Sequence, residues 1–373
     1  MIFDIIQPEK RCNFTPVSFR PYPMKKILLI FFAALMLLPA SLTAQNKGKF
    51  AVYGIAFYNL ENLFDTIPNN PLGRDEEYTP AGKNHWGSKK YWSKINNLAY
   101  CISQMTTKTT PGGPAIIGVS EIENRSVMDD LVKDPAIRSW QLQVVHHDSP
   151  DRRGVDVGLL YNPRMFKVTG VTNHTLSVPS NPTFRTRDQM CVTGVLACGD
   201  TISVIVNHWP SRLGGQEQSS YLREAAAALS KHIADSLWAI RPNQGVIIMG
   251  DLNDDPQDAS CAKVLGARKN AYDVKEHGFY NPWWKMLDKG IGTLAYKGSW
   301  NLFDQIIVGG TLLKDNARPG ALRYWKCQVN NFDFLIDRDG TRQGYPKRTH
   351  AAGVWLNGYS DHFPTEIFLL KQY

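Results

Sequence analysis

The sequence predicts a layered α/β fold, in which helices cover β-sheets. Short apolar runs of strand length recur from about residue 50 to the end of the chain. Two longer segments carry apolar residues at helical spacing, and these segments alternate with the strand-like runs. No charged block or Pro/Gly/Ser-rich linker marks a domain boundary. We therefore expect a single domain, which the length of the chain allows.

The elements follow in order along the chain. A strand is expected at residues 50–57, and an amphipathic helix at about 90–105 repeats apolar residues such as Tyr91 and Ile95 at helical spacing. A second helix is expected at 217–238. The other expected strands cover residues 115–120, 141–147, 155–161, 165–178, 190–198, 201–207, 246–249, 303–308 and 365–370. Three stretches are expected to be long loops, residues 66–90, 266–300 and 328–358, and loops of this length are often functional.

Composition narrows the class of protein. The 373 residues are 43% apolar and rich in aromatic side chains, which excludes a disordered chain. The formal charge of +8 is compatible with an anionic partner but does not demonstrate one. Six cysteines are too few for a disulfide scaffold, and none forms a CxxC pair, so structural zinc and redox chemistry are not expected.

The N-terminal segment has the pattern of a secretory signal peptide. Met24-Lys25-Lys26 precedes the apolar run 27–38, and small residues follow up to Ala44. The run is shorter than the ~20 residues that span a bilayer. We expect residues 1–23 to be an unstructured upstream extension, 24–44 the signal, and 45–373 the single domain. Cleavage after Ala44 would give a secreted or periplasmic protein without stable membrane insertion.

Polar residues cluster where the expected strands end. The segments are Asn59-Leu60-Glu61, Glu121, Asn207-His208, Asp251-Leu252-Asn253, Asp304 and Asp361-His362. Catalytic and ligand-binding groups tend to lie beyond strand ends in layered α/β folds. We therefore expect these side chains to gather at one edge of the domain.

Each of these residues also has a structural interpretation. Asn59 could cap a turn, Asp251 could cap a following helix, and His208 alone could be a buried core histidine. The whole set favours chemistry, because oxygen ligands suit Mg²⁺, Mn²⁺ or Ca²⁺. A calcium loop of the EF-hand type starting at Asp251 is excluded by Pro256 and Ala262 at its sixth and twelfth positions. The motifs of P-loop NTPases, zincins and lipase-type hydrolases are also absent from the sequence.

Taken in order, these segments resemble the endonuclease/exonuclease/phosphatase superfamily, over about residues 50–370. Each motif is weak alone, but the set occurs in the family's order. Asn59 to Asp65, together with the signal, looks most like the secreted bacterial branch of the family. The resemblance implies a four-layer α/β sandwich, with two mixed sheets packed face to face between helices.

The resemblance also implies a metal site. Glu121 would be the principal ligand, and Glu61 and Asp361 would approach the same ion, some through water. Asn59 and Asn253 would bind phosphate oxygens or belong to the coordination shell of the ion. Mg²⁺ is the expected cofactor, with Mn²⁺ and Ca²⁺ left open.

The same resemblance assigns the proton-transfer groups. His362 would position or activate the attacking water, and Asp304 would fix its tautomer. Asp251 would hold that water or protonate the leaving oxygen, and His208 would stabilise charge on the scissile phosphate. The expected reaction is in-line attack of water on phosphorus without a covalent enzyme intermediate.

One position departs from the nucleic-acid-cleaving members, which often carry a basic residue two positions after the metal glutamate. Here that residue is Glu123, which would repel a nearby phosphate unless it binds metal. Candidate substrate-binding residues are Asn207, Arg153 and Arg212, and both arginines could bind phosphate bidentately. Lower-ranked cations are Arg185, Arg187 and Arg348. Trp283 and Trp284 could stack on a base or sugar, although anchoring a loop is the more common role.

The leading hypothesis is a secreted, monomeric, metal-dependent phosphodiesterase that acts on nucleic acid. A phosphatase or a lipid phosphodiesterase of the inositol-phosphate or sphingomyelinase type is the nearest alternative. A non-catalytic surface-binding protein ranks low, because such a protein should have lost part of the set, and Glu121, Asp251, Asp304 and His362 are all present.

Overall fold

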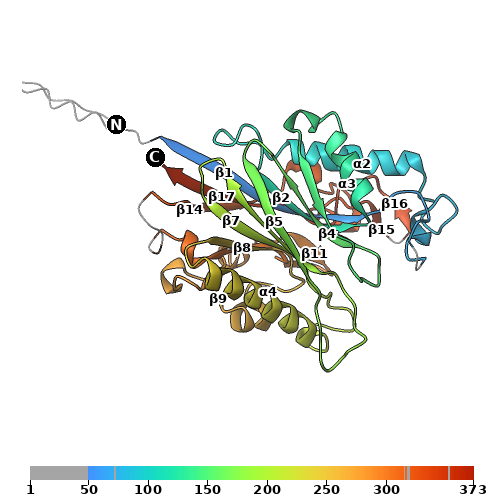
Figure 1. The fold of residues 1–373 in the computed structure, drawn as a ribbon. Coiled ribbons are helices and arrows are strands. Elements are labelled where there is room, and N and C mark those ends of the chain that lie inside the picture. Colours follow the sequence, from blue (N-terminus) through green and yellow to red (C-terminus); the bar gives the residue numbers. More distant parts are fainter. Residues whose placement is uncertain (1–48, 71–72, 315, 317–319, 352) are drawn as a thin grey trace, which may run out of the picture. The chain divides into compact units, whose positions relative to one another are not determined.

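The computed structural model describes residues 49–70, 73–314, 316, 320–351 and 353–373 (Figure 1). The expected upstream extension and signal peptide, residues 1–44, lie outside the described residues. The described residues belong to one compact unit. None of their helices has both the length and the apolar character needed to cross a bilayer, and all five of their cysteines are free.

Two large mixed sheets contain most of the strands in the described part of the chain. The first sheet has the strand order β14 (Arg323–Val329), β17 (Thr365–Gln372), β1 (Phe50–Leu63), β2 (Ile116–Ile122), β4 (Asp156–Tyr161) and β3 (Gln143–His146). The second has the order β5 (Phe166–His174), β6 (Gln189–Leu196), β7 (Thr201–His208), β8 (Gly245–Asp251), β13 (Asp304–Gly309), β10 (Phe279–Tyr280) and β9 (Ala267–Arg268). We call them the β1 sheet and the β8 sheet.

Shorter elements complete the chain. Two small hairpins pair β11 (Leu294–Tyr296) with β12 (Ser299–Asn301) and β15 (His350–Ala351) with β16 (Val354–Trp355). The α-helices are α2 (Ser88–Ser103), α3 (Arg125–Lys133), α4 (Ser220–Ile240) and α5 (Trp284–Leu287). Short 3-10 turns cover Glu76–Tyr78, Arg138–Trp140, Ala271–Asp273, Gly310–Leu312, Asp333–Leu335 and Gly340–Arg342, and a π turn covers Ser260–Val264.

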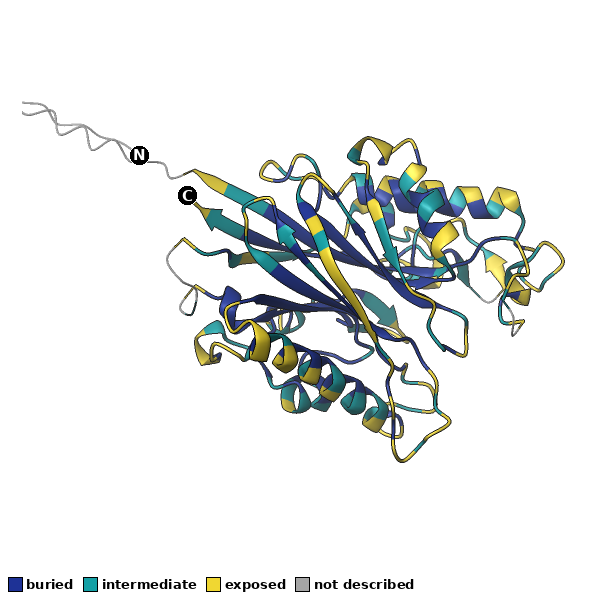
Figure 2. Cartoon of the chain, in the orientation of Figure 1, coloured by how far each residue is buried: buried dark blue, intermediate teal, exposed yellow. Residues whose placement is uncertain are grey.

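The predicted four-layer sandwich is confirmed. The two sheets pack face to face, and their facing side chains form the central apolar core (Figures 1 and 2). A second core lies between the β1 sheet and helices α2 and α3. A third lies between the β8 sheet and α4. Each sheet is therefore covered on both faces, which explains why its central strands are almost continuous apolar runs.

The alternation of side chains along β1 and β8 builds these layers. In β1, Ile55 and Phe57 point into the central core, whereas Ala56 lies in the core beneath the helices. In β8, Met249 faces the central core and Ile248 faces α4. Because successive side chains of a strand point to opposite faces, neighbouring apolar residues pack into different layers.

The expected strands and both expected helices are present, with ends that differ by a few residues and β1 continuing to Leu63. The elements that were not expected include α3, β14 and the short elements inside two of the expected loops or at their ends: β9, β10, α5, β11 and β12 in 266–300, and β15 and β16 in 328–358. Helix α3 has only nine residues, and its start is fixed by the Asn124 side chain, which accepts hydrogen bonds from the backbone N–H groups of Ser126 and Val127. Strand β14 is only partly buried, so it lacks the apolar pattern of an inner strand, and it is held by pairing with β17.

Strand pairing brings the polar segments to one edge of the sandwich. Strands β1 and β2 are parallel, as are β7 and β8, so each pair ends at the same side. In the β8 sheet, Asp251 lies opposite His208 on one side and opposite Asp304 on the other. In the β1 sheet, Asn59 lies opposite Ser120, after which the pairing of β1 with β2 is shifted by a bulge.

The bulge places residues in left-handed backbone conformations at this edge. Glu61 has a φ of 48°, Asn62 of 51° and Glu121 of 59°, and Asn253 beyond β8 has a φ of 50°. Such angles are uncommon for residues other than glycine and cost roughly 1–3 kcal/mol each. Bulges redirect side chains, and here they redirect the two glutamates that the sequence predicted as metal ligands.

The two sheets approach each other closely at Gly118 in β2. A Cβ atom at this position would lie 2.4 Å from Met249 Sδ. We expect Gly118→Val to reduce the free energy of unfolding by about 1–3 kcal/mol, because overpacking forces the sheets apart. Denaturant unfolding measures this change. Gly170→Val is the matched control, since a Cβ at Gly170 on the exposed β5 meets no atom within 4 Å. Combining Gly118→Val with Met249→Ala should recover part of the loss; equal effects at both glycines would contradict the assignment.

Candidate active site

A buried polar cluster lies at the strand edge just described. Asn59 is the last residue of the regular part of β1, Glu121 lies near the end of β2, and His208 and Asp251 end β7 and β8. Asp304 begins β13, and His362 lies just before β17. All six residues are at least nine-tenths buried. The structure thus brings together residues that are as far apart as 59 and 362 in the sequence.

Asp304 and His362 form the shortest contact in this cluster. Nδ1 of His362 donates a hydrogen bond to Oδ2 of Asp304 over 2.7 Å. The other ring nitrogen, Nε2, lies 3.9 Å from Oδ2 of Asp251. Burial alone would lower the pKa of His362, but the carboxylates of Asp304 and Asp251 outweigh it and hold that pKa well above its usual range. The imidazole is therefore oriented, and it carries a proton near neutral pH.

Asp251 lies at the centre of the cluster. Its Oδ2 accepts a hydrogen bond from Nδ2 of Asn59 over 3.0 Å. The same oxygen lies 3.6 Å from Nε2 of His208. Oδ1 accepts from the backbone N–H of Asn253 over 3.0 Å. Burial raises the pKa of Asp251 to about 6, so this carboxyl group titrates close to neutral pH.

His208 is held neutral. Its pKa lies well below the usual range because of burial and the nearby Arg187 guanidinium. Arg187 donates to the backbone oxygens of His208 and Trp209 over 3.1 and 2.7 Å, and pairs with Asp151 at 3.1 Å. Arg187 therefore supports the turn that presents His208, a role that the sequence did not reveal.

Glu121 lies beside His208 and pairs with Arg153. Oε1 of Glu121 accepts from Nη1 of Arg153 over 3.0 Å, and Oε2 accepts from the backbone N–H of Asn62 over 3.0 Å. Nε2 of His208 lies 3.9 Å from Oε1. Burial would raise the pKa of Glu121, but the Arg153 guanidinium outweighs it and holds that pKa well below its usual range. Glu121 is therefore ionised.

Glu61 and Asp361 are joined by Arg348. Nε of Arg348 donates to Oε1 of Glu61 over 3.0 Å, and Nη2 donates to Oδ2 of Asp361 over 2.8 Å. The backbone N–H of Thr349 donates to Oε2 of Glu61 over 2.6 Å. Burial and the Asp361 carboxylate raise the pKa of Glu61. The sequence ranked Arg348 low, yet it contacts two of the three expected metal ligands.

Lys94 was missed by the sequence analysis. Its Nζ lies 3.8 Å from Oε2 of Glu61 and donates to the backbone oxygen of Tyr359 over 2.8 Å. The side chain is fully buried, and burial lowers the pKa of this lysine to about 8. One signal was available: Lys94 falls on the apolar face of α2, between Tyr91 and Leu98 at helical spacing. A lysine on an apolar face needs a buried partner.

Three other predicted site residues lie near this edge, namely Asn207, Arg212 and Asn253. Their side-chain polar atoms form hydrogen bonds with residues outside the cluster. The Asn207 amide donates to the backbone oxygens of Ile205 and Met249 and accepts from Trp209 and Ser230.

The Arg212 guanidinium donates to Asp258 and to the backbone oxygen of Asn253, and Asn253 itself donates to the backbone oxygen of Trp209. These bonds tie the turns after β7 and β8 to one another. Trp283 is fully buried and donates to the backbone oxygen of Ile306, so it anchors its loop.

The donor set of the cluster has the chemistry of a hard cation site. Among the described residues, two groups of histidine and carboxylate side chains could hold a metal ion: Asp251 with Asp304 and His362, and His146 with Asp148 and Asp156. In the first group the charged His362 is a hydrogen-bond donor. Carboxylate oxygens at this edge therefore suit Mg²⁺ better than an imidazole-binding metal.

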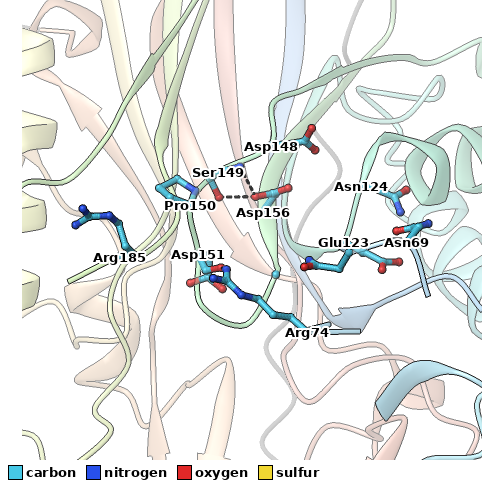
Figure 3. Close-up of a pocket in the computed structure, with 12 residues that line it drawn as sticks. Asn69, Arg74, Glu123, Asn124, Asp148, Ser149, Pro150, Asp151, Asp156 and Arg185 are labelled. Carbon is cyan, nitrogen blue, oxygen red and sulfur yellow. Dashed lines mark hydrogen bonds between the residues drawn. The ribbon is translucent and has the colours of Figure 1, made fainter. Parts of the chain in front are cut away.

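A pocket of about 650 Å³ borders the loop that carries Arg153 (Figure 3). The chain segment that forms one of its walls contains Asp151 and Gly154, and it carries Arg153 to Glu121. Glu123 lines the pocket as well, two residues after Glu121. Four carboxylates line it altogether, those of Glu123, Asp148, Asp151 and Asp156, together with Arg74 and Arg185.

Several solved structures share this fold. An endonuclease/exonuclease/phosphatase family protein from Bacteroides thetaiotaomicron is 16% identical, with 87% of this chain and 99% of that chain covered and a TM-score of 0.51. A D. rerio TDP2 humanized by 14 mutations is 13% identical, with coverages of 85% and 98% and a TM-score of 0.53. A mannosyl-6-phosphatase from B. thetaiotaomicron is 16% identical, with coverages of 85% and 99% and a TM-score of 0.50.

Comparison with curated proteins gives no match. The model of the endonuclease/exonuclease/phosphatase family matches residues 54–371, which include every strand described above except the first residues of β1 and the last residue of β17. The chain belongs to the endonuclease/exonuclease/phosphatase family.

Proposed function

We propose that this protein is a divalent-metal-dependent phosphoester hydrolase that uses water as the nucleophile. One observation carries the proposal: the buried chain of contacts from Asp304 through His362 to Asp251, with Glu121 and His208 beside it. An oriented imidazolium, a carboxyl group that titrates near neutrality and an ionised glutamate supply the groups that such a hydrolysis needs.

The proposed roles follow from the protonation states. Asp304 orients His362 and stabilises its charge, so that Nε2–H can donate to a phosphoryl oxygen or to the incoming water. Asp251, with a pKa of about 6, can accept a proton from water or return one to the leaving oxygen. Asn59 orients Asp251, and the neutral His208 can donate one N–H to the phosphate.

A metal ion would be held by Glu121, with Glu61 and Asp361 approaching the same ion. When bound, Mg²⁺, or alternatively Mn²⁺ or Ca²⁺, would polarise the phosphoryl oxygens and neutralise developing charge. Arg348 now joins Glu61 and Asp361, and Arg153 pairs with Glu121. Both guanidinium groups lie next to the carboxylates of the proposed metal ligands. Each is therefore positioned to bind a phosphate group that enters next to these carboxylates. Arg212, Asn207 and Asn253 would act by holding the turns that carry His208 and Asp251.

Nucleic acid remains the first substrate to test, as the sequence pattern indicates. A phosphatase acting on small phosphate esters is the second candidate, and the pocket in Figure 3 favours it. Its acidic side chains outnumber its two arginines, Arg74 and Arg185, and would repel the neighbouring phosphates of a polyanion. The structural likeness to a mannosyl-6-phosphatase is compatible with this second candidate. We further propose that the mature chain is exported as a monomer after cleavage of residues 24–44.

A substrate panel tests the proposal. The full chain is incubated with Mg²⁺ and separately with plasmid DNA, RNA, inositol phosphates, sugar phosphates and sphingomyelin, with EDTA as the control. We expect metal-dependent release of phosphate or cleavage of at least one substrate. The substrate cleaved separates a nuclease from a phosphatase and from a lipid phosphodiesterase. Hydrolysis of none of them would remove the proposed function.

The Asp304→Asn variant tests the orienting role. We expect kcat to fall by roughly 10²–10⁴-fold while folding is retained, because the amide can no longer fix the imidazolium. The pKa of His362, followed by NMR, should fall because one of the carboxylates that raise it is gone. Asp200→Asn is the matched control, since Asp200 pairs with Lys371 in the turn before β7. A near-wild-type kcat would exclude Asp304 from the mechanism.

The Glu121→Gln variant tests the metal ligand. The Mg²⁺ concentration needed for half-maximal rate should rise by roughly tenfold or more, because ligand charge sets the affinity of an oxygen site. Glu276→Gln, at an exposed glutamate, is the control for loss of one charge. An unchanged Mg²⁺ titration in Glu121→Gln would refute this assignment.

A further inference from the structure

Asp151 and Arg187 form an ion pair that is almost completely buried. Nη1 of Arg187 lies 3.1 Å from Oδ2 of Asp151, and the two side chains are only 5% and 3% exposed. Asp151 belongs to the loop between β3 and β4 of the β1 sheet, whereas Arg187 lies two residues before β6 of the β8 sheet. The pair therefore joins the two sheets, as the hydrogen bond from Asn59 to Asp251 also does.

The other carboxylate oxygen of Asp151 shapes the turn that carries Arg153. Oδ1 accepts a hydrogen bond from the backbone N–H of Arg153 over 2.8 Å and a longer one from that of Val155. The Arg74 guanidinium also donates to the backbone oxygen of Asp151 (Figure 3). Arg153 in turn donates to Oε1 of Glu121 over 3.0 Å. Asp151 thus fixes the backbone from which Arg153 reaches the proposed metal ligand.

Arg187 uses its remaining nitrogens to hold the turn that carries His208. Nε donates to the backbone oxygen of His208 over 3.1 Å, and Nη2 donates to that of Trp209 over 2.7 Å. Nδ1 of His208 is buried and has no hydrogen-bond partner among the described residues. By contrast, Nδ1 of His362 is held by Asp304. The position of the His208 ring therefore depends on the backbone that Arg187 holds.

Both ends of this series of contacts meet at one atom. Nη1 of Arg153 and Nε2 of His208 lie 3.0 and 3.9 Å from the same oxygen, Oε1 of Glu121. The contacts form a closed ring that contains Glu121, Arg153, Asp151, Arg187 and His208. Such a ring restricts its members more than a single contact does, because the other members must move when one of them is displaced.

We propose that Asp151 and Arg187 are a positioning pair that sets the distance between Arg153 and His208. The inference rests on the proposed function in one respect, since Arg153 and His208 are the groups that we expect to bind the phosphate of the substrate. The pair acts through these two groups and does not itself need to touch the substrate. The coupling belongs to the folded chain, so it can be measured whether or not hydrolysis is found.

Two conservative variants separate geometry from charge. Arg187→Lys keeps a positive charge beside Asp151, but an ammonium group cannot reproduce the planar set of three hydrogen bonds to the carboxylate and the two backbone oxygens. Asp151→Asn keeps the shape of the side chain and can still accept from the N–H of Arg153, but it loses the charge that faces Arg187. Both variants should loosen the ring of contacts.

NMR spectroscopy of the full chain, labelled with ¹⁵N in histidine and arginine, tests the coupling. Asp151→Asn should change the ring signals of His208, although Asp151 contacts only Arg187 on that side of the ring of contacts. Arg187→Lys should change the Nε–H signal of Arg153 for the same reason. An unchanged remote signal in either folded variant would overturn the proposal. If Asp151→Asn does not fold, Arg187→Lys decides the matter, because it retains a buried charge pair.

Ile202→Ala is the control for a general loss of stability. Ile202 is fully buried in the central core at the start of β7, six residues before His208, which is ~20 Å along the strand. Truncation of this side chain should lower the thermal midpoint, since it leaves a cavity. It should leave the signals of Arg153 and His208 in place. A purely structural role for the ion pair predicts the same result for all three variants.

Kinetics with a substrate that the panel identifies provide a second measurement. A misplacement of ~1 Å can cost about 10²-fold in rate, so kcat/KM should fall roughly 10–100-fold in Asp151→Asn and in Arg187→Lys. The double variant should lie within about threefold of the worse single variant, because residues that act as one unit are not additive. Losses that multiply would overturn the proposal. If no substrate is hydrolysed, the proposed function fails, and the NMR experiment still decides whether the pair couples the two groups.

Discussion

The hydrogen bond from Asn59 to Asp251 joins the two sheets at the edge where the site lies. Asn59 belongs to the β1 sheet and Asp251 to the β8 sheet, so this bond fixes the separation of the sheets at the place where the polar groups converge. Because Asp251 lies in register with both His208 and Asp304, the position of one carboxylate determines those of its neighbours. The central apolar core supports that position from below, since Met249 and Phe57 pack two residues before Asp251 and Asn59.

Charge balance organises the rest of this edge. Arg153 compensates Glu121, Arg348 compensates Glu61 and Asp361, and Arg187 holds the turn of His208. Each guanidinium comes from a loop, whereas most of the acids come from strand ends. The strands therefore fix the anionic part of the site, and the loops supply the cations. Substrate preference within such a family can change through the loops while the acidic edge is retained.

The sequence predicted the layered fold and the cluster because both depend on local signals. Apolar runs marked the inner strands, and polar residues directly after them marked the site. Arg348 was ranked low, because it lies in a long loop whose path depends on contacts with Glu61, 287 residues away. Strand β14 was missed because an edge strand needs little apolar character. Asn207 matched a family motif, but only the structure shows that its amide is fully used in bonds beneath the site.

The left-handed backbone at Glu61, Asn62, Glu121 and Asn253 has an evolutionary consequence. Glycine adopts these angles without strain, so a change to glycine would relieve the backbone while removing side chains that we propose as metal ligands. Stability and activity therefore pull in opposite directions at these positions. A lineage released from selection for the proposed activity could relieve the backbone strain here only by also replacing the cations that pair with these glutamates, Arg153 and Arg348.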